Sequence, residues 1–294
     1  MVISGAASHR RGLALVLMAG LLWSTSGLFI KLLTLSPFQI LGWRSLVAAL
    51  ATPLLARAFG IHLKIKLDLG SLAGALCYAS VLGGFVVATK LTTAANAIFL
   101  QFTAPIFILL LEPWLLKTRL GARELLAVGS CVAGMACFFV GRLSPGDWLG
   151  NLLALASGVG LAGFSLQMRH RSLTRPEEHP GGVLVLGNAL VVLLTSPWLL
   201  AGGWPSLGQG AALAYLGAFQ LGLAYLLFSS GIRRLTATEA GLTSMVEAVF
   251  NPLWVFFGIG ERPSPWALVG GVVILGTILT YGLRRPAVLE PPQG

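Results

Sequence analysis

Ten stretches of about twenty apolar residues follow one another along this 294-residue chain, separated by charged residues, proline or glycine. A helix needs about 20 apolar residues to cross the roughly 30 Å hydrocarbon core of a bilayer. Only 10% of the residues are charged, against about 25% in an ordinary soluble domain, so a water-soluble enzyme is excluded. The predicted spans cover residues 12–33, 38–58, 70–89, 93–114, 122–140, 149–168, 181–201, 209–230, 238–259 and 264–283.

The spans are predicted to be helices, because their side chains are apolar all round. A transmembrane β-strand would alternate apolar and polar residues over about ten positions. Residues 106–111, in contrast, are apolar at every position. The expected fold class is therefore an all-α polytopic membrane protein with ten transmembrane helices.

Lysine and arginine are divided unevenly between the two sides of the predicted spans. Cytoplasmic loops keep the Lys/Arg excess of a membrane protein. With the N-terminus inside, the inside segments hold Arg10, Arg11, Arg57, Lys64, Lys66, Lys117, Arg119, Arg123, Arg169, Arg171, Arg175, Arg233, Arg234, Arg284 and Arg285. The outside loops hold only Lys31, Lys90, Arg142 and Arg262. This bias predicts an even number of spans and two cytoplasmic chain ends.

The first span has a competing interpretation as a secretory signal peptide. Arg10 and Arg11 precede an apolar run whose first part ends near residues 24–27. The run continues to Leu33, which is longer than the apolar region of a signal peptide, and the internal repeat needs this helix. We therefore predict a retained transmembrane helix.

The second half of the chain repeats the first weakly but in order. Gly12 and Gly20 align with Gly150 and Gly158. The best stretch aligns Thr93, Ala94, Ala97, Phe107, Leu110 and Arg119 with Thr236, Ala237, Ala240, Phe250, Leu253 and Arg262. Five spans repeat as five, and because five is odd the second copy enters the membrane in the opposite sense. We predict two inverted-topology repeats, residues 1–144 and 145–294, as in secondary transporters that work by alternating access.

A set of residues spread over nearly the whole chain carries a family resemblance. It comprises Trp23, the Pro37–Arg44 region, Ala94–Pro105, and Gly260-Glu261-Arg262 followed by Gly270 and Gly276. The pattern resembles the drug/metabolite transporter superfamily, in its EamA-like ten-helix branch. Within it the chain looks most like bacterial exporters of aromatic and other neutral amino acids, which implies an inner-membrane protein that exports its substrate through a central cavity.

Polar residues within the spans are the first candidates for a substrate site. Glu247 lies about the middle of the ninth span, where an ionised carboxylate facing lipid would cost several kcal/mol. It is expected to attract a substrate ammonium, to carry a coupling proton, or to make a structural hydrogen bond. The other polar candidates are Tyr78, Gln101, Gln220, Ser244 and Asn251, each of which alternatively bonds a neighbouring helix.

Aromatic residues supply the apolar part of the predicted site. Trp23, Phe164, Tyr215 and Phe219 are expected to form a wall for an aromatic or aliphatic side chain, or else plain packing between helices. Arg44, near the outer end of its span, is predicted to snorkel to water. Glu112 and Glu239 are predicted to pair with the nearby Arg119 and Arg234 in loops.

Several other chemistries find no support in the sequence. The four histidines lie in tails or loops, and no Walker A or GxSxG motif occurs, so no catalytic group, metal or cofactor is expected. Cys77, Cys131 and Cys137 are interpreted as buried hydrophobes. The net charge of +10 is explained by topology, so nucleic acid is not an expected partner.

The sequence predicts a secondary transporter in the bacterial inner membrane that exports neutral amino acids, foremost aromatic or large apolar ones. Its expected partners are that small solute and the lipid bilayer. Two alternatives stay open at this stage: an exporter of lipophilic cations or drugs, and a membrane scaffold that transports nothing. Oligomeric state and the coupling ion are not predicted.

Overall fold

The computed structural model describes residues 6–92, 94–118, 121–137, 148–260, 262 and 265–283. Within these ranges the chain is helical and contains no strand. The helices are α1 (Ala6–Trp23), α2 (Ser26–Leu32), α3 (Pro37–Ala58), α4 (Leu69–Leu91), α5 (Ala94–Gln101), α6 (Ala104–Leu116), α7 (Ala122–Cys137), α8 (Trp148–Thr174), α9 (Gly182–Ala201), α10 (Leu207–Tyr215), η2 (Leu216–Leu223), α11 (Ala224–Gly231), η3 (Ile232–Arg234), α12 (Ala237–Ser244), α13 (Val246–Ile259) and α14 (Pro265–Leu283).

Eight helical stretches of the described chain are long and apolar enough to cross a membrane. They are Ala6–Leu32, Pro37–Ala58, Leu69–Leu91, Ala97–Leu116, Trp148–Thr174, Gly182–Ala201, Leu207–Arg234 and Ala237–Ile259. They match eight of the ten predicted spans. The predicted fifth span corresponds to α7, its residues 138–140 lying outside the described ranges, and the tenth corresponds to α14, a shorter apolar helix.

Three of the predicted spans are broken rather than continuous. The breaks fall between α1 and α2, between α5 and α6, and between α12 and α13. At each break a hydroxyl donates to the carbonyl three residues earlier: Thr25 to Leu22 (2.8 Å), Thr103 to Leu100 (2.7 Å) and Ser244 to Gly241 (2.8 Å). Such bonds satisfy carbonyls that lipid would leave unpaired, so irregular backbone is tolerated at these points.

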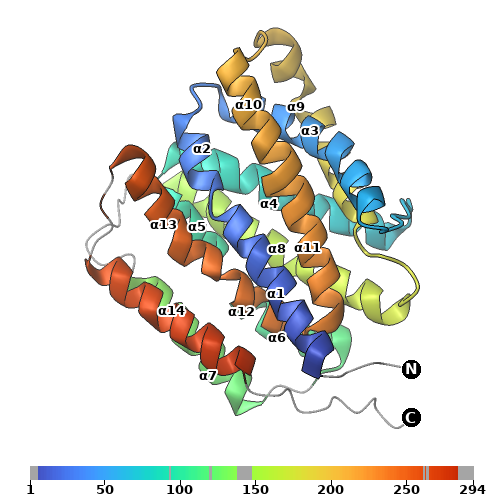
Figure 1. Cartoon of the computed structure of the whole chain (residues 1–294), viewed down its shortest axis with the longest axis vertical. Coiled ribbons are helices and arrows are strands. Elements are labelled where there is room, and N and C mark those ends of the chain that lie inside the picture. Colours follow the sequence, from blue (N-terminus) through green and yellow to red (C-terminus); the bar gives the residue numbers. More distant parts are fainter. Residues whose placement is uncertain are drawn as a thin grey trace.

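The helices pack in pairs that join the two halves of the chain. In Figure 1, α1 lies beside α11 near the centre, and α3 beside α9 at one edge. Helix α4 packs on α8, and η2 packs on α3. Helices α7 and α14 form a separate pair at the opposite edge and touch the remainder through α6, α12 and α13. Elements from both halves therefore meet at the centre of the molecule.

Glycine contacts recur in the two halves at aligned positions. A Cβ on Gly12 would collide with Arg234 and Leu235, and one on Gly150 would press on Leu91 and Thr92. Residues 91 and 92 align with 234 and 235 in the register that pairs Thr93 with Thr236. The first and sixth predicted spans thus approach matching points of the opposite halves, where only a glycine leaves room.

A second pair of glycines behaves in the same way beside the helix breaks. Gly20 approaches the Ser244 carbonyl and Val246, and its aligned partner Gly158 approaches the Gln101 carbonyl and Thr103. Residue 101 aligns with 244, and 103 with 246. Each of these two breaks is therefore held against a glycine from the other half of the chain.

The segments predicted to be cytoplasmic meet at one end of the molecule, here called the basic end. It comprises the start of α1 and residues 59–68, 169–181 and 231–239. Leu63 pairs with His179 in an isolated β-bridge, and Lys66 binds Glu178. Arg171 lies 3.2 Å from Asp68. These contacts draw loops from both halves together.

Hydrogen bonds and ion pairs at the basic end keep its carboxylates ionised. The hydrogen bond from the Ser71 backbone, followed by the smaller effect of Arg171, holds the pKa of Asp68 well below its usual range. Lys66, with help from Lys64 and Arg171, lowers the pKa of Glu178. Both carboxylates therefore stay ionised, and they crosslink the loops that follow α3 and α8.

The two carboxylates predicted to form loop ion pairs bind other groups, and the predicted pair of Glu239 with Arg234 is wrong. Glu112 is buried and accepts hydrogen bonds from the N–H groups of Ala237 and Thr238, both at 2.9 Å, and from the Thr238 hydroxyl at 2.6 Å. Its expected partner Arg119 lies outside the described residues. Glu239 contacts His9 at 3.1 Å instead of Arg234. Glu112 thus supplies the anion that favours the N-terminus of α12.

We expect Glu112→Ala to lower the free energy of unfolding by about 2–5 kcal/mol, because it leaves two buried N–H groups at the start of α12 without acceptors. Glu112→Gln keeps one acceptor oxygen and should lose about half as much. Thermal denaturation of the purified protein in detergent measures both. An alanine variant as stable as the wild type would contradict this anchoring role.

His179 should make the protein sensitive to mild acid. Its Nδ1 accepts from the Gly181 N–H at 3.1 Å and its Nε2 contacts the Ser230 hydroxyl at 3.0 Å, so the neutral ring suits the site. Burial, and then Arg233 and Arg234, lower the pKa of His179 from 6.5 to about 4. Because the folded pKa is depressed, stability is full above pH 6.5 and falls as pH drops towards 4.

The free energy of unfolding is expected to fall by about 2 kcal/mol between pH 6.5 and pH 5. Asp68 and Glu178 do not yet titrate in this pH range. Denaturation midpoints of the wild type and His179→Gln across this range test the assignment. The variant should show a flatter pH profile; superimposable profiles would refute it.

Candidate functional site

A small internal cavity lies where helices of both halves converge. Its lining comes from α1, α3, α4 and α5 of the first half and from α8, η2, α11 and α13 of the second. The lining residues are Trp23, Arg44, Val81, Leu82, Phe85, Gln101, Leu161, Gln220, Leu221, Tyr225 and Glu247. Its volume is about 20 Å³, which holds a water molecule and no larger solute. The protein is therefore in a closed conformation.

The polar side chains on the cavity come from several different elements. Gln101 of α5 donates to the Ser157 hydroxyl at 2.7 Å, which itself donates to the Val81 carbonyl at 3.1 Å. The buried Oε1 of Gln220 finds no donor among the described residues. Gln220 lies on η2, a π-type helical segment, and such segments often occur at functional sites.

Glu247 brings a carboxylate to this cavity from the first turn of α13. The side chain is buried, and within the described part of the chain it forms no ion pair. It is not exposed to lipid, in agreement with the energetic argument from the sequence. The carboxylate therefore faces the cavity rather than lipid.

Arg44 also lines the cavity, and the prediction that it snorkels to water is wrong. Its side chain is 1% exposed. The Nη2 atom donates to the Leu82 carbonyl of α4 at 3.3 Å, whereas Nε and Nη1 find no acceptor among the described residues. Close packing of α3 on η2, where Gly217 meets the Arg44 carbonyl, turns the guanidinium inward.

An aromatic cluster of Trp23, Tyr78, Phe164, Tyr225 and Phe228 packs beside the cavity. Tyr225 is central, with ring centroids 4.5 Å from Trp23, 4.7 Å from Tyr78 and 5.7 Å from Phe164. The Tyr78 hydroxyl accepts from Asn188 at 3.3 Å. Contacts of this kind stabilise by about 0.5–1.5 kcal/mol per pair beyond the area they bury.

The cluster lies between the cavity and the basic end. Helix α4 starts at the basic end, and Tyr78 precedes its cavity residues. Helix α8 runs towards that end, and Phe164 follows the cavity residue Leu161. Phe228 likewise follows Tyr225 on the way to η3. The packed rings therefore close the cavity on this side.

Apart from Ser244, the predicted site residues fall into three groups. Trp23, Gln101, Gln220 and Glu247 line the cavity, and Tyr78 and Phe164 lie in the aromatic cluster. Tyr215, Phe219 and Asn251 are outside both groups. Tyr215 contacts the Thr25 hydroxyl at 3.1 Å, Phe219 is 47% exposed, and Asn251 packs against Gly27 of α2.

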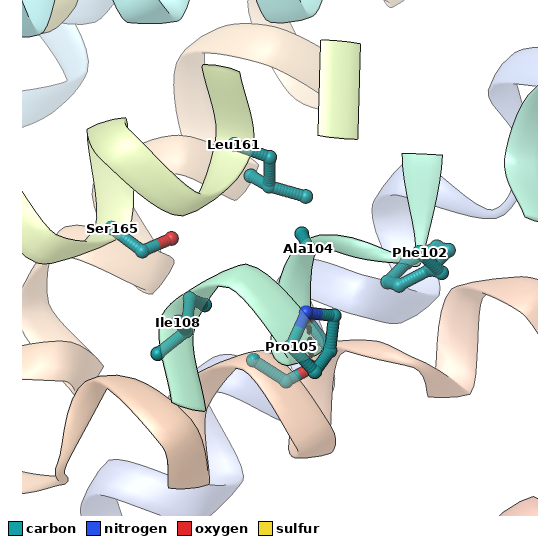
Figure 2. A pocket seen from close by; sticks show the side chains of 8 residues that line it. Phe102, Ala104, Pro105, Ile108, Leu161 and Ser165 are labelled. Carbon is teal, nitrogen blue, oxygen red and sulfur yellow. Dashed lines mark hydrogen bonds between the residues drawn. The ribbon is translucent and has the colours of Figure 1, made fainter. Parts of the chain in front are cut away.

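Ser244 borders a tighter gap at the break between α5 and α6. Figure 2 shows Leu161 and Ser165 of α8 facing the turn at which Phe102, Ala104 and Pro105 lie. Ser244 and Gly241 of α12 complete the lining, and the gap holds no water-sized space. Gln101 and Ser244, which are aligned positions of the two halves, therefore border neighbouring spaces rather than one cavity.

Arg44 and Tyr225 are the cavity residues with a polar group that sequence reasoning did not assign to the site. The sequence contains a feature that could have identified each of these two residues. Arg44 aligns with Asn188, so the equivalent spans of both halves carry a polar residue at this point. Tyr225 lies inside the eighth predicted span with a hydroxyl that needs a partner away from lipid, the same signal that selected Tyr78.

Comparison with known proteins identifies the family. The family model described as "EamA-like transporter family" matches residues 10–140 and again residues 148–282. An uncharacterized transporter of Bacillus subtilis, YwfM, is 29% identical over 281 residues, covering 92% of this chain and 93% of the relative. An uncharacterized transporter of Archaeoglobus fulgidus is 27% identical over 290 residues, covering 88% of this chain and 93% of the relative.

A solved crystal structure shares the fold. It superposes with a TM-score of 0.75 at 21% identity and covers 92% of this chain and 96% of its own. The described residues contain no group of three metal-ligating side chains. Since the family model matches most of the chain in two consecutive copies, the chain belongs to the EamA-like transporter family and is a multi-pass membrane transporter rather than an enzyme or a scaffold.

Proposed function

We propose that this transporter exports neutral amino acids with aromatic or large apolar side chains from the cytoplasm across the bacterial inner membrane. The observation that carries the proposal is the cavity between the two halves, where Glu247 faces the aromatic rings of Trp23, Phe85 and Tyr225. A carboxylate attracts the substrate ammonium, and the rings receive its apolar side chain. Mostly apolar walls with a few placed polar groups are usual for small-molecule sites.

The proposed mechanism is alternating access by two inverted five-helix repeats, residues 1–144 and 145–294. Gly12 and Gly150 make equivalent contacts in the opposite halves, and so do Gly20 and Gly158. These matching contacts support a two-fold relation between the halves. So do the breaks after residues 101 and 244, which are aligned positions. If two copies of one architecture exchange conformations, the shared cavity opens to opposite sides in turn.

The proposed orientation places both chain ends in the cytoplasm, with ten membrane-crossing helices. Support comes from the basic end, where segments rich in Lys and Arg gather from both halves. At the opposite end, Lys90 donates to the Leu33 carbonyl and Gln39 donates to the Gly202 carbonyl. In this orientation the aromatic cluster is the barrier on the cytoplasmic side.

Counterflow in proteoliposomes tests the substrate class. Vesicles loaded with unlabelled phenylalanine should accumulate labelled phenylalanine, and leucine should compete better than glycine. A labelled quaternary ammonium dye should not accumulate. Dye uptake without amino-acid uptake would instead establish an exporter of lipophilic cations, which a carboxylate and aromatic walls also suit.

Glu247→Gln should reduce phenylalanine counterflow about tenfold or more, because an amide lacks the charge that attracts the ammonium. The matched control is Glu124→Gln, which alters a carboxylate in the first turn of α7 that does not line the cavity, and it should transport normally. Membrane quantities of both variants must equal the wild type. Full activity of Glu247→Gln from pH 6 to 8 would show that this carboxylate neither binds substrate nor couples protons.

A further inference from the structure

The most unusual group in the membrane part of the structure is the guanidinium of Arg44. It has five N–H donors in a planar fork and keeps its charge in proteins. Only one hydrogen bond reaches it in the described part of the chain, the 3.3 Å contact of Nη2 with the Leu82 carbonyl. Leaving a buried charge without a partner is strongly destabilising, so a residue of this kind needs a functional explanation.

The surroundings of Arg44 contain a carboxylate that does not neutralise it. Glu247 lines the same cavity, yet the two side chains form no ion pair. The rest of the polar lining is Gln101, Gln220, the Tyr225 hydroxyl and the indole N–H of Trp23. The cavity thus offers a guanidinium and a carboxyl group that do not bind each other.

Nε and Nη1 are the atoms of Arg44 that lack acceptors among the described residues. A guanidinium binds a carboxylate in a bidentate manner through Nη2 together with either Nε or Nη1, so a carboxylate on either of these faces would use one acceptor-free nitrogen of Arg44 and one N–H of Nη2. Such charge-assisted bonds are stronger than neutral ones. The acceptor Oε1 of Gln220 suits a donor such as an ammonium, as does Glu247. Donors and acceptors for both charges of an α-amino acid are therefore present.

We propose that Arg44 binds the α-carboxylate of the substrate, and that Glu247 and Gln220 bind its α-ammonium. The proposal rests on the proposed function and specifies it further: the ligand is a zwitterion, with its apolar side chain among the aromatic rings. A lipophilic cation is disfavoured because it would share the cavity with an unpaired guanidinium. In the closed conformation the cavity holds only a water molecule, so substrate binds after the helices separate.

A purely structural Arg44 would tie α3 to α4 through the Leu82 carbonyl. That role uses one donor of five, and an uncharged amide would perform it without burying a charge. It predicts a change in stability and none in ligand selectivity. Ligand selectivity therefore separates the two roles.

Three compounds that share a phenyl ring provide the test: phenylalanine, phenethylamine without the carboxylate, and 3-phenylpropionate without the ammonium. In wild-type proteoliposomes phenylalanine should compete for phenylalanine counterflow about 10- to 100-fold better than phenethylamine. In Arg44→Gln that preference should fall to about one, and Arg44→Lys should be intermediate, because lysine keeps the charge and loses the bidentate geometry.

Arg169→Gln is the matched control. Arg169 is a partly buried arginine at the basic end that donates to the carbonyls of Ile232 and Arg233, and it does not line the cavity. Its variant should keep the wild-type preference for the carboxylate. Equal competition by phenylalanine and phenethylamine in the wild type would overturn the proposal even if Arg44→Gln fails to fold.

Binding without transport separates this proposal from the proposed function. Thermal stabilisation of the purified protein by the same three compounds needs no flux. If no amino acid is transported, yet 3-phenylpropionate stabilises the wild type and not Arg44→Gln, the substrate class is wrong and the acid-binding site stands. If phenylalanine is transported and wild type and Arg44→Gln show the same preference, the role of Arg44 is refuted and the function stands.

Discussion

Lipid supplies no hydrogen-bond partners, and this constraint governs the placement of each polar group in the helix bundle. The hydroxyls of Thr25, Thr103 and Ser244 satisfy carbonyls at the three helix breaks, and Glu112 caps α12 from the other half of the chain. Arg44 differs, because two nitrogens of its buried guanidinium meet no acceptor among the described residues. A buried guanidinium in that position forms stronger hydrogen bonds with an anionic ligand than the neutral polar groups that line the cavity.

The helix breaks are the points at which the bundle would bend in the proposed alternating access. The breaks after residues 101 and 244 are irregular turns of backbone that pack against a glycine of the opposite half, Gly158 or Gly20. They interrupt the fourth and ninth predicted spans near the cavity. Half-helices on either side of such a break can tilt separately at little cost in hydrogen bonds. The aromatic cluster is held mainly by ring packing, and under the proposed alternating access its rings would separate when the cavity opens towards the basic end.

Sequence periodicity and charge located most of the helices, because lipid demands long apolar runs and translocation sorts basic loops. They missed the helix breaks, the first turns of α1 and the last turns of α8. The same reasoning selected Glu247 and Gln101, which line the cavity, since each is polar in mid-span. Arg44 was misplaced because its depth depends on how α3 packs against η2, and no pattern within one helix reveals that. Tyr215 and Phe219 were expected in the aromatic wall, yet Tyr215, the last residue of α10, contacts Thr25, and Phe219 of η2 is exposed.

Alternating access at the central cavity is tested most directly by accessibility from each side of the membrane. Gln220→Cys, in a chain whose native Cys77, Cys131 and Cys137 are replaced by alanine, would be exposed to an impermeant thiol reagent in right-side-out and inside-out vesicles. The account predicts that position 220 is labelled from both sides and that saturating substrate slows the labelling. A cysteine in place of Leu50, on the exposed surface of α3, should stay unlabelled. Labelling of position 220 from one side only, or from neither, would contradict it.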